Sequence, residues 1–335
     1  MILIDAIYIN NSGGKVLLDY LIECVEKTEI QIHYLLDNRI INNHPKIKKT
    51  NNITYCSAGL LARHKFYKIH CESFSKVLCF GNLPPTVRIN SVVLTYFHQP
   101  LFIEIPKSIN FVNKFKISVK MQIIYLIKKN TDKWLVQSNN VKIGLCEKYN
   151  LENKSISLLP FYPPLPTDNK ILRIKNKFIY ISNVGVHKNH KRLIEGFCNF
   201  FDKFQVGELG LTVNSKADVE IALIESAQKK GYPIINYGFI NREELVKIYN
   251  SSEYLVFPSL AESFGLGLVE AIESGCNVIG ADLPYTYEIC EPSITFDPMS
   301  VKDIQSAFEQ AINQKINPTI KKVNNKIEKL IKLLK

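Results

Sequence analysis

The chain has 335 residues, more than one hydrophobic core usually supports, and this length predicts two domains of roughly 150 to 170 residues each. Its composition, 46% apolar and 22% charged, is typical of a soluble globular protein. The longest uncharged segment, residues 89–103, is too short to span a membrane, which argues against an integral membrane protein. The eight cysteines include no C-x-x-C pair, so we expect reduced thiols.

The positive charge is concentrated in two segments. The chain carries 42 basic and 31 acidic residues, a formal net charge of +11. Residues 107–133 and residues 315–335 each contain seven lysines and a single acidic residue, so the rest of the chain is nearly neutral. This pattern indicates that the protein contacts an anionic partner surface through these two segments. Met1 leads directly into an apolar run with no basic start, and we therefore expect no secretory signal and a cytoplasmic protein.

Strand and helix patterns alternate through the first half. This alternation predicts a doubly wound α/β domain, with a parallel sheet covered by helices on both faces. Buried-strand patterns stand at residues 2–8, 30–36, 53–56, 77–80, 91–96, 134–137 and 156–159, and helical patterns at 15–27, 58–74, 111–127 and 138–149.

Two features of this half are candidate contacts for a ligand. Gly13 and Gly14 open the first helix directly after the first strand, where backbone amides can meet a ligand at the edge of a parallel sheet. The motif is not G-x-G-x-x-G, so a merely tight turn is the alternative. His98 ends another strand and is followed by Gln99 and Pro100. A buried structural histidine is the alternative there.

The helical pattern at residues 111–127 is apolar and basic. Its apolar residues recur at helical spacing, with lysines beside them at positions 114, 116, 120, 128 and 129. Such a segment can lie on an anionic membrane surface. An ordinary surface helix with a solvated lysine face is the alternative.

A proline-rich segment separates the two halves. Residues 160–166 contain four prolines, so we place the domain boundary there, with domains at residues 1–165 and 166–315. Residues 316–335 repeat apolar positions with lysines between them, which predicts a basic amphipathic helix. This helix would either pack on the first domain or lie on lipid. The second half continues the alternation, with strands at residues 177–182, 209–213, 234–237 and 254–257 and helices at 191–201, 218–230, 241–249 and 266–274.

Residues 258–291 carry the pattern most informative about function. Glu262 and Glu270 are eight residues apart, about 80° out of line on a regular helix, so we expect Glu262 in a loop and Glu270 in the following helix. Gly265 and Gly267 allow close approach of the backbone, and Gly275 fits a left-handed helix end. A helix N-terminus attracts phosphate, and carboxylates accept hydrogen bonds from hydroxyl groups. The predicted ligand is a nucleotide-sugar.

This stretch resembles the E-x7-E motif of retaining glycosyltransferases of family 4. The resemblance implies the GT-B fold, in which two Rossmann-like doubly wound domains face an interdomain cleft. It implies that Glu270 binds the ribose and that Glu262 binds hydroxyls of the donor sugar and acts in catalysis. The donor would also meet the loop and helix start formed by Ser263, Phe264, Gly265 and Leu266.

The resemblance extends to other positions. It implies that Lys188 binds the donor diphosphate, that Gly238 and Phe239 hold the base, and that His98 lines the reaction centre as a catalytic residue. It also makes Gly13 and Gly14 contacts in the cleft. The chain departs from the family pattern at Asn183, where many members have an arginine. Diphosphate binding then depends on helix amides and on Lys188, Lys191 or Arg192.

The reaction implied is transfer of a hexose-type sugar from a nucleoside diphosphate to a hydroxyl, with retention at the anomeric carbon. No D-x-D motif is present, and we expect neither a metal nor a cofactor, because lysine and helix N-termini can neutralise the leaving diphosphate. The leaving phosphate helps to deprotonate the acceptor in the family's proposed mechanism, so we assign no protein nucleophile.

The basic segments suggest the acceptor. A polyprenyl-diphosphate-linked glycan at the inner face of the cytoplasmic membrane, as in O-antigen or capsule synthesis, would account for both. A GT-B sugar-nucleotide epimerase is one alternative, and a non-catalytic protein that binds nucleotide-sugars or nucleic acid is another. Nucleic acid is not expected as a partner, because neither basic segment shows a recognised binding motif. The base, the sugar and the linkage stay open.

Overall fold

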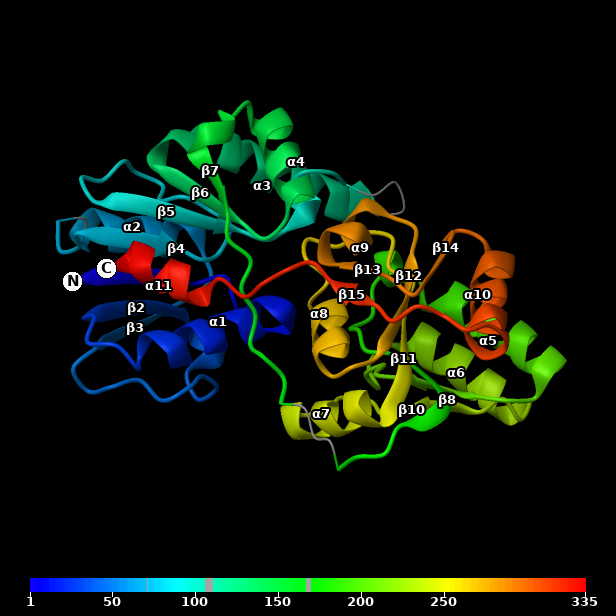
Figure 1. Cartoon of the computed structure of the whole chain (residues 1–335). Helices are drawn as coiled ribbons and strands as arrows, with labels where there is room; N and C mark the ends of the chain where they lie inside the picture. Colours follow the sequence, from blue (N-terminus) through cyan, green and yellow to red (C-terminus); the bar gives the residue numbers. More distant parts are fainter. Residues whose placement is uncertain (71, 106–110, 167–169) are drawn as a thin grey trace. The chain divides into compact units, whose positions relative to one another are not determined.

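The computed structural model describes residues 1–70, 72–105, 111–166 and 170–335. The chain divides into two compact units, each an α/β layer structure (Figure 1). The first unit comprises Met1–Pro163 and Asn324–Lys335, and the second comprises Pro164–Val323. The boundary predicted at residue 165 lies close to this division, but the last twelve residues return to the first unit.

The first unit is built on a seven-stranded parallel sheet with the order β3-β2-β1-β4-β5-β6-β7. The order reverses between β1 and β4, and ligands of open α/β sheets bind beyond the strand ends at such a switch point. The strands are β1 (Ile2–Ala6), β2 (Ile32–Asp37), β3 (Asn52–Cys56), β4 (Lys76–Cys79), β5 (Val92–Phe97), β6 (Lys133–Val136) and β7 (Ile156–Leu158), and the helices are α1 (Ser12–Val25), α2 (Leu60–His70), α3 (Phe111–Ile127), α4 (Asn139–Tyr149) and α11 (Ile327–Leu334).

The second unit repeats this plan with a six-stranded parallel sheet in the order β10-β9-β8-β11-β12-β14. Its switch point lies between β8 and β11. The strands are β8 (Ile174–Tyr180), β9 (Glu208–Leu211), β10 (Ile234–Asn236), β11 (Ser252–Phe257), β12 (Asn277–Ala281) and β14 (Ile294–Phe296), and the helices are α5 (His190–Phe204), α6 (Asp218–Lys229), α7 (Arg242–Ser251), α8 (Leu266–Glu273), α9 (Pro284–Ile289) and α10 (Val301–Asn313).

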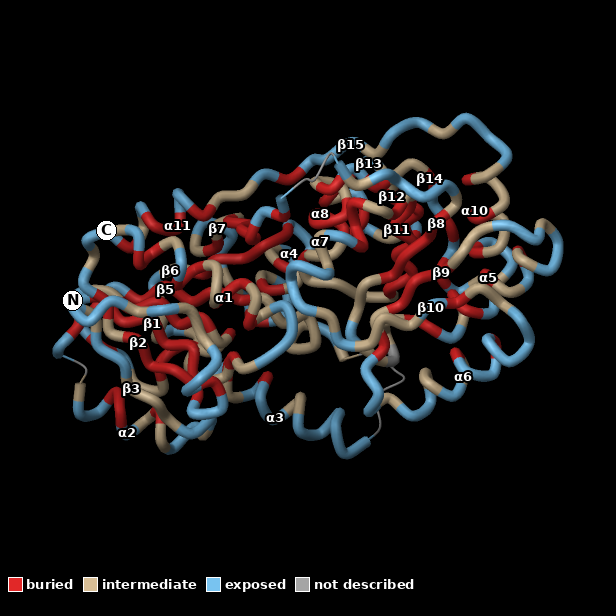
Figure 2. The backbone as a smooth tube through the Cα atoms, turned by 90° about the horizontal axis from the view of Figure 1, so that it is seen from below, coloured by how far each residue is buried: buried red, intermediate tan, exposed pale blue. Residues whose placement is uncertain are grey.

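The sheets form the core of each unit. The central strands are buried nearly throughout, while the outer faces of the helices are exposed (Figure 2). This is the arrangement expected of parallel strands that are covered on both faces. The prediction of two doubly wound α/β domains is confirmed.

Two helix ends follow their sequence signals. Asn241 and Glu244 form the capping box that opens α7, as predicted. Gly275 has a φ of +78°, and its N–H donates to the carbonyl of Ile272 while the N–H of Cys276 donates to that of Ala271. These two bonds form a Schellman motif, which ends α8 with the glycine in the left-handed conformation.

The prediction of a helix from residue 316 onwards is wrong in its first half. Pro318 cannot donate a helical hydrogen bond and disfavours helix at the residue before it. A short strand follows instead, β15 (Ile320–Lys321), which pairs antiparallel with β13 (Cys290–Glu291). Only α11 is helical. Its apolar side chains are buried in the first unit, and Asn325 just before it donates to the carbonyl of Tyr162 at 2.6 Å.

No helix among the described residues has the length and hydrophobicity needed to cross a membrane. The basic segment 107–133 is described from residue 111 onwards, and Lys107 lies outside the described residues.

Candidate functional site

The loop between β11 and α8 carries the first predicted acid, Glu262. Phe264 is buried and anchors this loop, while Gly265 at the helix start has a φ of +72°, a conformation that favours glycine. The loop is also tied to its neighbour, because the N–H of Leu260 donates to the carbonyl of His187 at 2.7 Å. Glu262 is therefore held in a loop before the helix, as expected, with Ser263 beside it.

Lys188 and Glu262 are brought together by these two loops. The Lys188 Nζ lies 2.5 Å from a carboxylate oxygen of Glu262, and the side chains are only 18% and 12% exposed. Tyr180 on β8 fixes the position of Lys188, because its hydroxyl donates to the Lys188 carbonyl at 3.0 Å. The residues predicted to bind the diphosphate and the sugar hydroxyls are thus direct neighbours, and their opposite charges form an ion pair.

Glu270 lies in the second turn of α8 and is 6% exposed. Burial raises the pKa of this carboxyl from 4.5 to about 7, even though Arg242 and the hydroxyl of Tyr249 favour the charged form. An Arg242 nitrogen is 3.5 Å from the carboxylate. Burying the ionised form of such an acid costs folding free energy, and buried acids with a raised pKa cluster at functional sites.

Sequence reasoning missed Arg242. This residue is the first of α7 and comes three residues after Phe239, whose side chain is 86% exposed. Gly238 has a φ of +66°, so the turn predicted to hold the base has a conformation that favours glycine. The only sequence signal for Arg242 was a basic residue beside this turn. Its partner, Glu270, is 28 positions away in the chain.

The start of α5 is the second helix N-terminus near Lys188. Asn189 is buried in a left-handed conformation, and its side-chain amide donates to the carbonyls of Pro258 and Pro298 at 3.2 and 2.7 Å. It thereby joins the loops that follow β8, β11 and β14. Arg192 donates to the Asn189 oxygen at 3.0 Å, while Lys191 is exposed. Both cations proposed to assist Lys188 therefore stand in the first turn of α5.

Gly267, expected to allow approach of the backbone to a phosphate, also lies next to the sheet. An added Cβ would lie 3.4 Å from the hydroxyl of Tyr249 and 3.4 Å from the ring of Phe257. These are ordinary van der Waals distances, so the packing of α8 on the sheet does not require a glycine here.

Gly14 and His98 meet in the first unit. A Cβ at Gly14 would lie 3.1 Å from the His98 ring, whereas one at Gly13 would meet nothing within 4 Å. Burial lowers the pKa of His98 to about 4, so the ring is neutral at pH 7. Its Nε2 lies 3.1 Å from the Phe80 carbonyl, which can only accept, and 3.5 Å from the Asn82 side-chain nitrogen, which can only donate. The shorter contact favours the tautomer with the proton on Nε2 and with Nδ1 as an acceptor.

Asn82 is a second residue that sequence reasoning missed. It lies just after β4 with a φ of +67°, and its side-chain oxygen accepts from the His98 N–H at 2.6 Å. The bond fixes the end of β5, from which His98 extends. An asparagine after a glycine was its only sequence signal.

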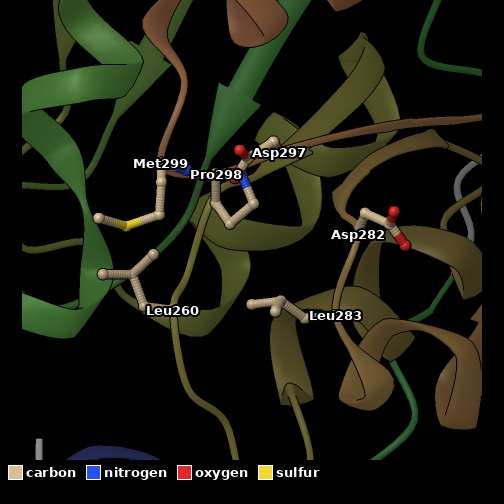
Figure 3. Close-up of a pocket in the computed structure, with 6 residues that line it drawn as sticks. All are labelled: Leu260, Asp282, Leu283, Asp297, Pro298 and Met299. Carbon is tan, nitrogen blue, oxygen red and sulfur yellow. Dashed lines mark hydrogen bonds between the residues drawn. The ribbon is translucent and has the colours of Figure 1, made fainter.

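A pocket of about 520 Å³ adjoins the Glu262 loop in the second unit. In Figure 3, Leu260 and Leu283 face Asp297, Pro298 and Met299, with Asp282 to one side. Its carboxylates already have partners, since the Tyr287 hydroxyl donates to Asp282 at 2.6 Å and the Met299 N–H donates to Asp297 at 2.8 Å. Neither predicted acid of the E-x7-E pattern lines this pocket.

Among the described residues, three groups of predicted site residues thus lie close together. Lys188 contacts Glu262 and Gly14 adjoins His98, while Glu270 adjoins the helix that follows Gly238 and Phe239. The first and third sets belong to the second unit and the other to the first unit.

Comparison with known proteins finds a family model that matches about half of the chain, chiefly the second unit. Residues 166–330 match the glycosyl transferases group 1 family. The chain is 32% identical to the serotype-specific mannosyltransferase WbdA of Escherichia coli over 93 residues, 28% of this chain and 11% of WbdA. It is 25% identical to the O-antigen chain mannosyltransferase RfbU of Salmonella typhimurium, over 63% of this chain and 58% of RfbU. The matches therefore span less than two thirds of these relatives.

The fold is also that of known glycosyltransferases. The structure of Anabaena HepE in complex with UDP and glucose has a TM-score of 0.67 at 11% identity, covering 93% of this chain and 90% of HepE. Its likeness to the two units establishes the GT-B fold predicted from the sequence.

Proposed function

We propose that the protein is a retaining glycosyltransferase of family 4, which transfers a sugar from a nucleoside-diphosphate sugar to a saccharide acceptor. The proposal rests on one observation. Within the segment that matches the glycosyl transferases group 1 family, both acids of the E-x7-E pattern are paired with cations. Glu262 contacts Lys188, and the buried Glu270 contacts Arg242. Each acid is thus held in place by a cation until the donor binds.

Donor binding exchanges these contacts for new ones. The diphosphate is a stronger partner for Lys188 than a single carboxylate, and the N-termini of α5 and α8 add favourable dipoles. Glu262 is then released to accept hydrogen bonds from sugar hydroxyls. The ribose hydroxyls donate to Glu270 beside the turn formed by Gly238 and Phe239, which holds the base.

The chemical step follows from the same groups. The bond between the anomeric carbon and the diphosphate oxygen breaks, and Lys188 stabilises the charge that develops on the leaving group. The acceptor hydroxyl attacks from the same face and passes its proton to the leaving phosphate, so the sugar keeps its configuration. His98 accepts a hydrogen bond from a sugar hydroxyl through Nδ1. We propose that no metal takes part, which predicts full activity in excess chelator.

We propose that the acceptor is a glycan on a polyprenyl diphosphate at the cytoplasmic face of the membrane, in the synthesis of a surface polysaccharide. Similarity to an O-antigen chain mannosyltransferase supports this acceptor class, and the lysine-rich segments support a peripheral location. The donor base and sugar are open, because the contacts assigned to them are backbone groups and carboxylates that many donors satisfy.

A panel of nucleotide-sugars tests the proposal. Purified protein is incubated with each donor, with and without a lipid-linked saccharide, and nucleoside diphosphate and sugar products are measured. We expect one donor to be consumed, slowly without acceptor and fast with it, and to give a product with unchanged anomeric configuration. Glu262→Ala and Glu270→Ala should abolish transfer without unfolding the protein. An interconverted sugar would instead indicate an epimerase, and tight binding of every donor without turnover would indicate a binding protein.

A further inference from the structure

Helix α3 exposes large apolar side chains on a folded domain. It packs on the first unit through Met121 and Ile124, which are buried. On its outer side Phe111 is 84% exposed, Phe115 64% and Leu126 77%. Most of the helix is accordingly drawn as exposed in Figure 2. Exposed apolar residues in a group, rather than singly, mark an interaction surface.

The exposed apolar residues form a stripe along one side of the helix, interrupted by Gln122 between Val119 and Leu126. At about 100° per residue, Phe111, Phe115, Val119 and Leu126 fall within an arc of about 80°. Ile124 lies about 180° from the centre of that arc, so the stripe is opposite the face that packs on the domain. The sequence pattern alone did not distinguish these two apolar faces.

Lysines border the stripe on both sides. Lys114 and Lys116 each lie about 60° beyond one of its edges, and Lys120 lies farther round on the side of Lys116. All three are exposed. The ion pairs formed within the part of the chain that the structure describes include none of them. Their charge is therefore available to an external anionic partner.

We propose that this stripe and its bordering lysines, together the α3 face, dock the protein on an anionic lipid bilayer. The helix would lie in the plane of the interface, with Phe115 and Leu126 in the acyl boundary and the lysines at headgroup phosphates. Charge complementarity favours lipid, because an apolar stripe flanked by lysines matches the layered chemistry of a membrane surface. The inference rests on the peripheral location proposed above and names the element responsible.

The other lysine-rich segment, residues 315–335, exposes lysines without an apolar stripe. The apolar residues of α11 are buried against the first unit, and its exposed residues include Lys329, Lys332 and Lys335. This segment can add electrostatic attraction but has no apolar stripe left to insert. The structure thereby assigns docking to α3, which the sequence left open between the two segments.

Vesicle binding of the full-length protein tests the proposal without turnover, so it can fail while the glycosyltransferase assignment stands. Sedimentation with phosphatidylcholine vesicles is compared with sedimentation on vesicles that contain phosphatidylglycerol. A Lys114→Gln, Lys116→Gln, Lys120→Gln variant should lose about fivefold in partition coefficient per lysine, about 100-fold in all. The matched control replaces Lys329, Lys332 and Lys335 by Gln, with the same loss of charge, and should lose less than tenfold.

The apolar contribution has its own variant and control. Phe115→Ser with Leu126→Ser should weaken binding at least about tenfold, because both side chains leave the acyl boundary. The control changes Leu61 and Ile69, two residues of α2 that are 79% and 74% exposed, to Ser and should bind as the wild type does. Phe115→Trp should show blue-shifted fluorescence on anionic vesicles, against the background of the buried Trp134.

Three results would overturn the inference. Equal losses in the two lysine variants would indicate diffuse attraction, and unchanged binding of the Ser variant would indicate that α3 does not insert. A change of the oligomeric state in the Ser variant, without any vesicle binding by the wild type, would indicate that a second copy of the chain covers the stripe.

Discussion

Replacing Glu270 by Gln should raise the stability of the fold above pH 7 and weaken the binding of the donor. Folding moves this carboxyl into a site where burial raises its pKa from 4.5 to about 7. Between these pH values the native protein binds more protons than the unfolded chain, so stability falls as the pH rises. At about 1.4 kcal/mol per pH unit, the loss is about 3 kcal/mol once the pH exceeds 7.

Glutamine has nearly the same shape and stays neutral, so the Glu270→Gln variant avoids this loss. Its free energy of unfolding should match that of the wild type near pH 4.5 and exceed it by up to about 3 kcal/mol at pH 8. Donor binding should change in the opposite direction. Hydrogen bonds from ribose hydroxyls to a carboxylate contribute about 1.5 to 3 kcal/mol, so the Kd for the nucleoside diphosphate should rise about 10- to 100-fold at pH 8.

The assay combines urea unfolding at several pH values with calorimetric titration of the nucleotide. Wild-type affinity should increase as the pH rises through 7, because the ligand prefers the charged carboxylate, and the variant should lose this part of the pH dependence. Glu273→Gln is the matched control on the same helix, since Glu273 pairs with Lys321 at 2.9 Å. It should bind the nucleotide within about twofold of the wild type. Unchanged nucleotide affinity in Glu270→Gln, or a loss of its stability at pH 8, would refute the reasoning.

Three further changes test other parts of the account. Lys188→Ala removes the cation assigned to the leaving diphosphate and should lower kcat at least about 100-fold, as steady-state kinetics would show. The control Lys203→Ala, at the exposed far end of α5, should keep the wild-type kcat. Asn82→Ala removes the acceptor of the His98 N–H and should lower kcat with unchanged nucleotide affinity, so a variant with wild-type kcat would contradict its role. Gly275→Ala forces a Cβ into a left-handed conformation and should cost about 1 to 2 kcal/mol, seen as a lower Tm.

Local sequence signals predicted much of the fold. Apolar runs of strand length alternated with helical patterns, and both sheets are parallel as this alternation requires. The left-handed glycine after α8 and the capping box of α7 depend on residues within a few positions of one another. Such features can be recognised without knowledge of the tertiary structure.

Contacts between distant positions could not be predicted in this way. The pairs Arg242–Glu270 and Asn82–His98 depend on which loops the sheet brings together. Apolar spacing alone also predicted a helix from residue 316, because the effect of Pro318 and the pairing of β15 with β13 did not enter that pattern. The loop position of Glu262 was predicted, whereas its ion pair with Lys188 was not.

The structure of the complex with a nucleoside-diphosphate sugar tests the central claim most directly. We expect ribose hydroxyls within about 3.2 Å of the Glu270 carboxylate, and Lys188 turned from Glu262 to the diphosphate. A donor bound elsewhere, with the Lys188–Glu262 and Arg242–Glu270 pairs both intact, would contradict it.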